Sequence, residues 1–234
     1  MLQPLIFAAL LGGISAPPPR EKEPQPPTDE EWRMAVEKMK KIGQAIDNYR
    51  DANGVFPADY VDRRTGKPTC SWRLAIVPYM DIGQDPVFKR LNLSEPWDGP
   101  TNKLLLEKMP DVYSPVRVKA GAGMTYYQGF AGKNAMLDPA ERQKISLARI
   151  YDGPSNTCFL VEAGTAVEWT KPADIPFDEE KDLPRLGGPF DGWFTMLMCD
   201  MSVVTVRRDF HAGTMKSVVM RNDGKSKNLD RLRR

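Results

Sequence analysis

The clearest periodic pattern in the chain starts after a run of prolines. Apolar residues recur there with spacings of three and four, which is the period of an amphipathic α-helix. Thr28 and Glu31 have the spacing of a capping box, and Asn53-Gly54 can end a helix in the left-handed conformation. We therefore predict a long helix, capped by Thr28 and running through residues 32–52, with one buried stripe: Trp32, Ala35, Met39, Ile42, Ile46 and Tyr49.

Strand-like apolar runs come later in the chain, at residues 156–163, 194–199 and 202–206. Two residues, Asp200-Met201, separate the last two runs, and this spacing predicts a hairpin. Both central residues of such a short turn need positive φ, which Met adopts poorly. We expect Met201 to be strained or the turn to be of another type.

Three shorter helices are predicted at residues 71–79, 102–109 and 214–220. The chain contains 21 prolines, which favour short elements and long irregular connections. Helices and strands do not alternate along the chain, and this order is typical of an α+β fold. We expect the long helix to pack on an antiparallel sheet.

The N-terminus resembles a secretory signal peptide over residues 1–16. Its apolar run, residues 5–11, precedes small residues, although no Lys or Arg precedes it. The run is too short for a membrane-spanning helix, which needs about 20 residues. Six prolines among residues 17–27 then predict an extended linker. The alternatives are a wrong start codon or an uncleaved end. We expect export to the periplasm, the cell surface or the medium.

The 234 residues carry a net charge of +2, and residues 28–224 suffice for one domain. The basic tail, residues 225–234, is expected to be a solvated end, and no nucleic-acid partner is expected. Cys70, Cys158 and Cys199 form no Cys-x-x-Cys pair, so a zinc site is not expected. Cys158 and Cys199 lie in strand-like runs and are either a disulfide or buried thiols.

The sequence predicts no catalytic residue, no cofactor and no metal site, because motifs for hydrolases, metalloproteases and nucleotide binding are absent. His211, the only histidine, is expected on the surface or in a loop. Five carboxylates match no calcium loop and are expected to form a solvated acidic loop: Asp174, Asp178, Glu179, Glu180 and Asp182. Four tryptophans are expected in the core or, alternatively, at a glycan or peptide site: Trp72, Trp97, Trp169 and Trp193.

Short blocks in a fixed order resemble the bacterial pilin-like proteins of domain-of-unknown-function family 1559. The blocks begin with Lys41–Ile46 and Phe56-Pro57. The resemblance implies a pilin-like fold, with family-motif residues that are structural first: Trp72, Pro96, Trp97, Asp98, Asp152, Gly153, Ser155, Asn156, Gly187, Gly188 and Asp200. In the C-terminal His-x9-Asp-Gly signature, Phe190 replaces the His and Met201 replaces the Gly. The long apolar helix of pilins is missing, so assembly through that helix is not expected.

Together these features predict a non-catalytic, exported, pilin-like protein with a structural or binding role in the cell envelope or outside the cell. Envelope proteins or glycans are the expected partners, and no transmembrane span is expected. One alternative is a carbohydrate- or peptide-binding module that uses loop tryptophans. A second alternative is a hydrolase with an unrecognised site.

Overall fold

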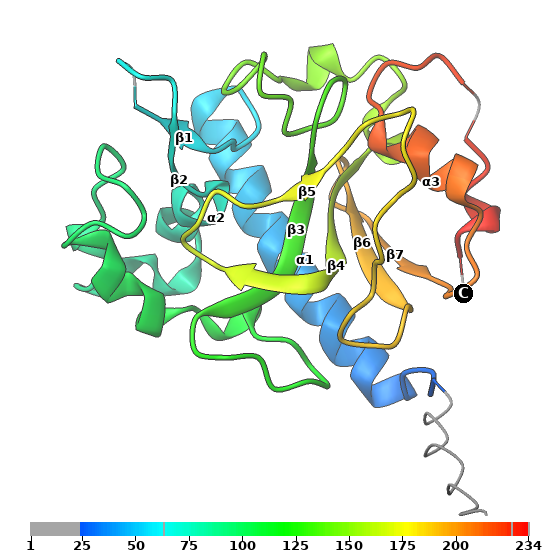
Figure 1. The fold of residues 1–234 in the computed structure, drawn as a ribbon, viewed down its shortest axis with the longest axis horizontal. Coiled ribbons are helices and arrows are strands. Elements are labelled where there is room, and N and C mark those ends of the chain that lie inside the picture. Colours follow the sequence, from blue (N-terminus) through cyan, green and yellow to red (C-terminus); the bar gives the residue numbers. More distant parts are fainter. Residues whose placement is uncertain (1–23, 63, 226, 234) are drawn as a thin grey trace, which may run out of the picture.

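The computed structural model describes residues 24–62, 64–225 and 227–233, so the predicted signal peptide and most of the predicted linker lie outside the described residues. Short strands and 3₁₀ helices connect a few longer elements (Figure 1). In chain order these are α1 (Asp29–Asn53), β1 (Tyr60–Val61), β2 (Pro68–Cys70), α2 (Trp72–Ala75), η1 (Val77–Tyr79), η2 (Asp81–Gln84), η3 (Phe88–Arg90), η4 (Asn102–Lys108), η5 (Asp111–Tyr113), β3 (Met124–Ala131), η6 (Leu147–Arg149), η7 (Pro154–Asn156), β4 (Cys158–Glu168), β5 (Ile175–Pro176), β6 (Phe194–Met198), β7 (Val203–Val206), α3 (Ala212–Val219) and η8 (Leu229–Arg231).

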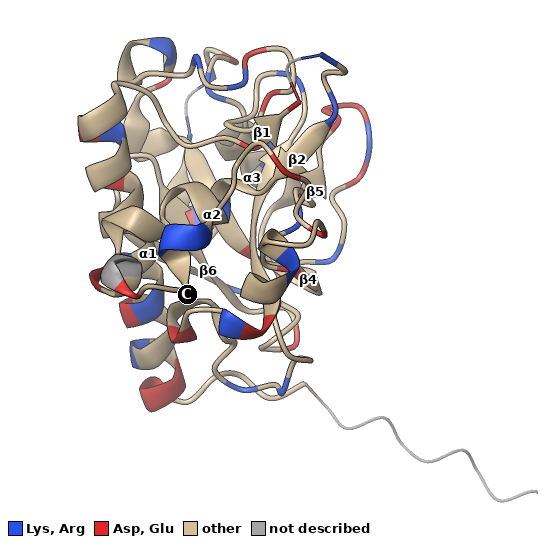
Figure 2. Cartoon of the chain, turned by 90° about the vertical axis from the view of Figure 1, so that its left-hand side faces the viewer, with Lys and Arg blue, Asp and Glu red and all other residues tan. Residues whose placement is uncertain are grey.

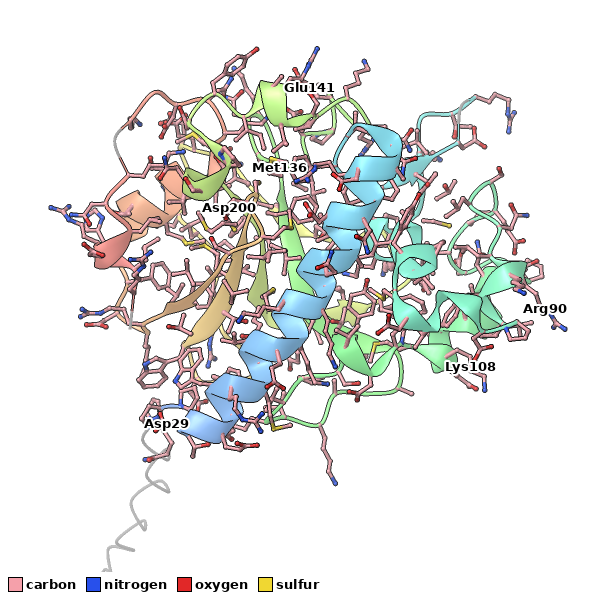
Figure 3. All side chains as sticks on the ribbon, turned by 180° about the vertical axis from the view of Figure 1, so that it is seen from behind. Asp29, Arg90, Lys108, Met136, Glu141 and Asp200 are labelled. Atoms are coloured by element: carbon pink, nitrogen blue, oxygen red, sulfur yellow. The ribbon has the colours of Figure 1, made fainter. Side chains whose placement is uncertain are left out.

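The long helix α1 confirms the periodic pattern and both of its predicted ends. The backbone N–H of Glu31 donates to the Thr28 hydroxyl at 3.2 Å, and the backbone N–H of Thr28 donates to the Glu31 carboxylate at 2.8 Å. Gly54 ends the helix with φ of 75°. Every residue of the predicted apolar stripe is buried. Figure 3 shows α1 crossing the sheet, with Asp200 on one side of the helix and Arg90 and Lys108 on the other.

A glycine in the middle of α1 allows the helix to approach the sheet closely. A Cβ atom on Gly43 would lie 2.9 Å from the Leu197 Cδ1 atom of β6. Glycine weakens a helix interior by roughly 1 kcal/mol relative to alanine. The close packing of α1 on β6 therefore favours a residue that the helix by itself disfavours.

The main sheet has five strands in the order β5-β3-β4-β6-β7. The neighbours β3–β4, β4–β6 and β6–β7 are antiparallel, as predicted, whereas β5 pairs with β3 in parallel. The fold is α+β as predicted, and the sheet is mixed because of this one short pair. The strand β3 was not predicted, because its residues, which include the buried polar Thr125 and Gln128, show no alternation of apolar and polar positions.

The hairpin between β6 and β7 has a different turn from the predicted two-residue one. The backbone N–H of Met201 donates to the Met198 carbonyl at 3.0 Å, and that of Met198 donates to the Ser202 carbonyl at 2.9 Å. Met201 has φ of 66°, as in a type I turn that is followed by a left-handed residue. The prediction of a two-residue turn is wrong, and the alternative of another turn type is confirmed.

The predicted short helices form with changed types and bounds. The predicted helix at residues 71–79 is divided into α2 and η1, and the one at residues 102–109 is the 3₁₀ helix η4. The last helix, α3, begins at Ala212 because His211 caps it. The His211 Nδ1 atom accepts from the backbone N–H of Thr214 at 3.0 Å.

Two hydrophobic clusters lie on the two faces of the sheet. Successive residues of β6 alternate between them: Leu197 belongs to the cluster under α1, and Met196 and Met198 belong to the cluster that α3 completes. Figure 2 shows the layer formed by α1 beside the strands, with acidic residues at the N-terminal end of the helix. The long helix and α3 therefore cover opposite faces.

Most described residues of the basic tail are exposed, as predicted, but Lys227 and Leu232 pack on the domain, so for these two the expectation of a solvated tail is wrong. Leu232 is fully buried in the second cluster. Its carbonyl accepts from the backbone N–H of Arg207 at 2.9 Å. The Lys227 side chain is 1% exposed and forms ion pairs with Asp152 and Asp223.

The three cysteines are free and buried, so the alternative of a Cys158–Cys199 disulfide is wrong. Burial raises the pKa of all three thiols, that of Cys70 to about 12. A thiol needs a lowered pKa to react as a nucleophile near neutral pH. These cysteines therefore have the properties of core residues.

Candidate functional site

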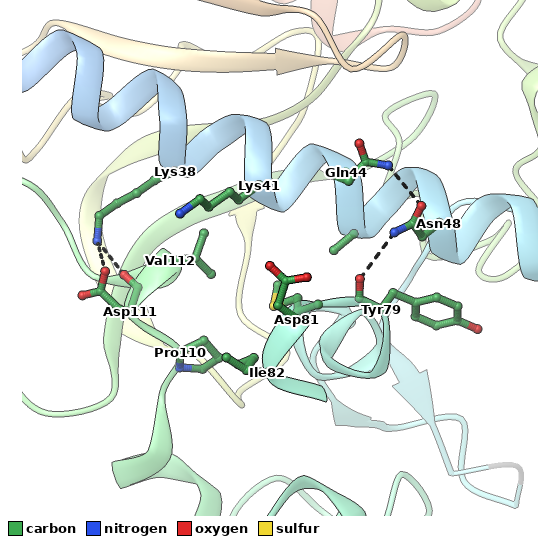
Figure 4. Close-up of a pocket in the computed structure, with 12 residues that line it drawn as sticks. Lys38, Lys41, Gln44, Asn48, Tyr79, Asp81, Ile82, Pro110, Asp111 and Val112 are labelled. Atoms are coloured by element: carbon green, nitrogen blue, oxygen red, sulfur yellow. Dashed lines mark hydrogen bonds and ion pairs between the residues drawn. The ribbon is translucent and has the colours of Figure 1, made fainter. Parts of the chain in front are cut away.

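A groove lies along the solvent-facing side of α1, where the segments of η1–η2 and η5 run beside the helix (Figure 4). Its volume is about 310 Å³, at the lower end of the range for small-molecule sites. Apolar side chains from the three segments form much of its wall, namely Ala45, Met80, Ile82 and Val112. Ile82 is 39% exposed, so part of this wall faces water.

Several polar groups of the groove are engaged by one another. The Lys38 Nζ atom donates to the Asp111 carbonyl at 2.6 Å and forms an ion pair with the Asp111 carboxylate at 2.9 Å. The Gln44 amide donates to the Asn48 side-chain carbonyl at 3.1 Å. The contacts of Lys38 connect α1 to η5 at one rim of the groove.

Lys41 and Asp81 differ from these engaged groups. Both line the groove, Lys41 from α1 and Asp81 from η2. Among the described residues neither forms a salt bridge, with each other or with a third residue. Figure 4 shows the Asp81 carboxylate directed toward α1 and the Lys41 side chain extending over the same groove. The groove therefore presents one cation and one anion whose charges are not neutralised by neighbours.

The described lining residues of the groove include neither Cys nor His. His211 lies elsewhere: it is exposed in the loop before α3, as predicted, and its side chain caps that helix. No cluster of His, Cys, Asp and Glu that could hold a metal ion occurs in the described part of the chain.

One of the five acidic residues expected in a solvated loop is buried instead. The Asp174 side chain is 1% exposed and forms an ion pair with Arg73 at 2.8 Å. Its Oδ1 atom also accepts from the indole N–H of Trp72 at 3.2 Å and from the backbone N–H of Gly129 at 2.7 Å. The other four carboxylates are partly or fully exposed. Asp174 therefore belongs to a core network that local sequence could not reveal.

A second buried carboxyl group, Glu162 on β4, lies under the helix layer. Its Oε2 atom accepts from the backbone N–H of Thr195 at 2.7 Å and from the Thr195 hydroxyl at 2.8 Å. Its Oε1 atom has no hydrogen-bond partner among the described residues. Burial raises the pKa of Glu162 from 4.5 to about 7, and the hydrogen bonds from Thr195 only partly oppose this.

The predicted family-motif residues contact different parts of the chain and do not form one site. Trp72 belongs to the Arg73–Asp174 network. Pro96, Trp97 and Asp98 form a turn near β2, where the backbone N–H of Trp97 donates to the Thr69 carbonyl at 2.7 Å.

A second group of these residues stabilises turns. Asp152 accepts from the backbone N–H groups of Asp223 and Gly224, and the Asn156 amide donates to the Asp152 carbonyl at 2.9 Å. Gly153 has φ of 92°, and Ser155 is exposed. The Asp200 carboxylate accepts from the Ser202 backbone and hydroxyl.

Gly187 and Gly188 meet the strand β4 directly. Their backbone N–H groups donate to the carbonyls of Glu162 and Ala163 at 2.8 and 2.9 Å. Gly187 has φ of 68°, and a Cβ atom there would lie 2.4 Å from the Trp193 carbonyl oxygen. The backbone of Trp193 lies too close to residue 187 to leave room for a Cβ atom, so this position requires glycine.

The tryptophans offer little surface for a glycan. Trp32, Trp72 and Trp169 are buried. Trp97 and Trp193 are half-buried, and each carries a cation over its ring: Lys171 at 5.1 Å from the Trp97 centroid and Arg208 at 5.8 Å from that of Trp193. A sugar ring would have to displace these cations before it could stack.

The sequence by itself does not identify the groove. The groove combines three segments that the chain brings together only on folding, so no local pattern marks it. The unpaired charges of Lys41 and Asp81 give a signal only when their surroundings are known.

The structure is an α+β domain in which a long helix packs on a mixed sheet and borders an open groove. A family model described as a protein of unknown function (DUF1559) matches residues 36–209, and the chain belongs to this family. No curated protein and no solved structure matches the chain. In the described residues, no helix has the length and apolar character that crossing a membrane requires.

Proposed function

We propose that this chain is a non-catalytic, pilin-like protein that is exported to the cell envelope or beyond and binds a ligand there through the groove beside α1. The groove carries the proposal, because it joins an exposed apolar wall to polar groups. Membership of the family supports the kinship with pilin-like proteins. The signal-like N-terminus supports export.

The groove, more than the tryptophans, supports a binding role. Lys171 and Arg208 cover the half-buried rings of Trp97 and Trp193. The Ile82 side chain in the groove is exposed. A partner that contacts this protein gains more by covering the apolar wall of the groove.

Export and binding can be tested together in intact cells of the source organism. A photo-crosslinking amino acid replaces Ile82 in the groove, and in a control protein it replaces Leu104, which is exposed but does not line the groove. After irradiation, cells are fractionated and the intact mass of the protein is determined. We expect an envelope or extracellular species that starts near Ala16 or Pro17, with an adduct from position 82 only.

A full-length species confined to the cytosol would overturn the export part of the proposal. Equal adducts from positions 82 and 104, or none from either, would overturn the assignment of the groove as the binding site.

A further inference from the structure

The groove is lined by equal numbers of positive and negative side chains, but not all of them form ion pairs with one another. Two cations and two anions line it: Lys38, Lys41, Asp81 and Asp111. Lys38 and Asp111 neutralise each other at 2.9 Å. Lys41 and Asp81 form no ion pair among the described residues, although they come from segments on opposite sides of the groove.

Other cations of α1 show that pairing is common on this helix. Arg33 pairs with Glu30 and Glu37, and Arg50 pairs with Asp47 and Asp51. Lys40 is exposed and forms no ion pair in the described part of the chain, but it does not line the groove. Lys41 is therefore distinguished by its position at an apolar wall, where a charged ligand group would be only partly hydrated.

From this arrangement we propose that the groove binds a small zwitterion with an apolar side chain, either a free α-amino acid or a short peptide. The ligand carboxylate contacts Lys41, its ammonium group contacts Asp81, and its side chain covers Ile82 and Val112. This assignment rests on the proposed binding function and adds the ligand class.

Charge and size select this class among small ligands. Asp81 would repel a purely anionic ligand, and Lys41 would repel a purely cationic one. A zwitterion satisfies both. The volume of about 310 Å³ suits an amino acid or a dipeptide better than a larger molecule.

Isothermal titration calorimetry on the full chain tests the proposal with leucine, the dipeptide Leu-Leu, N-acetyl-leucine and leucinamide. We expect leucine or Leu-Leu to bind, and the two capped compounds to bind about tenfold more weakly, because each lacks one charged contact. A preference between leucine and Leu-Leu distinguishes the free amino acid from the peptide source. Equal affinity for zwitterionic and capped compounds, or no heat from any of them at about 10 mM, overturns the ligand class.

Charge-removing variants assign each contact. Lys41→Ala should weaken the zwitterion about tenfold and leave leucinamide, which has no carboxylate, unchanged. Asp81→Asn should weaken the zwitterion similarly and leave N-acetyl-leucine unchanged. Lys40→Ala is the matched control and should bind as the parent protein does. All three positions are exposed, so we expect each variant to fold. A thermal unfolding curve for each variant verifies this.

The two proposals fail in distinguishable ways. If the groove crosslinks an envelope component in cells but no zwitterion binds in solution, the binding function stands and the ligand class is wrong. If zwitterions bind in solution with the expected dependence on Lys41 but the protein stays in the cytosol, the ligand class stands and the export is wrong.

Discussion

At the scale of single residues, Glu162 connects the stability of the fold to pH. Its carboxyl group is buried on β4, with two hydrogen bonds to one oxygen and none to the other among the described residues. A raised pKa means that the folded protein holds a proton between pH 4.5 and 7 that the unfolded chain releases. The contribution of Glu162 to stability is therefore complete below pH 4.5 and is lost as the pH rises through 7.

Glu162→Gln should remove this loss. We expect the variant and the parent protein to unfold alike near pH 4.5 and the variant to be more stable by roughly 3 kcal/mol above pH 7, since each unit of pKa shift corresponds to about 1.4 kcal/mol. Urea unfolding across the pH range measures the difference. Burial also raises the pKa of Asp59 to about 7, so only the difference between the two proteins reports on Glu162. The control variant Glu107→Gln, at an exposed position, keeps Glu162 and should lose stability with rising pH as the parent protein does. An equal loss of stability in Glu162→Gln and in the parent protein would contradict the prediction.

Met201 combines an unfavourable backbone conformation with useful packing. Its φ of 66° disfavours any residue with a Cβ atom, but its side chain lies against the cluster under α1. A single replacement by Gly changes both terms at once. The comparison of two replacements isolates the backbone term.

Met201→Gly should be more stable than Met201→Ala by about 1 kcal/mol, because both lose the same packing and only alanine keeps the left-handed penalty. Thermal or urea unfolding of the two variants measures the difference. If alanine proves as stable as glycine, the left-handed conformation of residue 201 is wrong.

At the scale of elements, the ends of the described chain are tied to the domain. Arg117 donates to the carbonyls of Gln25 and Pro26 and pairs with Glu31 at 2.7 Å, which fixes the approach of the chain to α1. At the other end, η8 and Leu232 cover the second cluster, and Lys227 neutralises Asp152 and Asp223. Leu232 and Lys227 of the C-terminal segment thus pack against the core, which the basic composition of this segment does not indicate.

Truncation after Gly224 should destabilise the protein by at least about 3 kcal/mol, because it removes a buried leucine and leaves two buried carboxylates without their cation. The free energy of unfolding in urea measures this loss. Lys225→Ala, which removes only an exposed pair with Glu179, should change it by less than about 1 kcal/mol. A truncated chain as stable as the parent would show that the segment is dispensable.

At the scale of the whole molecule, Arg73 joins the irregular region to the sheet. Its guanidinium donates to the Tyr127 carbonyl of β3 at 2.7 Å and to Asp174 at 2.8 Å. Its own carbonyl accepts from the Tyr113 hydroxyl at 3.1 Å. One buried cation therefore connects α2, η5, β3 and the segment before β5.

Arg73→Met should destabilise the protein by about 3 to 5 kcal/mol, because it leaves the buried Asp174 carboxylate without its partner. The double variant Arg73→Met/Asp174→Asn should recover part of the loss. Arg33→Met, which removes exposed pairs only, should cost less than about 1 kcal/mol. Urea unfolding of the four proteins checks this order, and equal effects at positions 73 and 33 would contradict it.

The elements with strong local signals could be predicted, and those defined by pairing could not. The capping box, the stripe of α1 and the hairpin strands follow from neighbouring residues, and all form in the structure. The strand β3 and the two-residue β5 lack a periodic signal. The turn at Met201 differs from the prediction because loop length in a hairpin depends on the register of both strands.

The α+β class, the long helix with its buried face and the resemblance to the family can all be predicted from sequence, because periodicity, capping and motif order are properties of adjacent residues. Which charges are buried, and where a groove forms, depends on how distant segments pack. Arg73 and Asp174 lie 101 positions apart, and Lys41 and Asp81 belong to separate elements. The dielectric surroundings and partners of such groups exist only once distant segments have packed together.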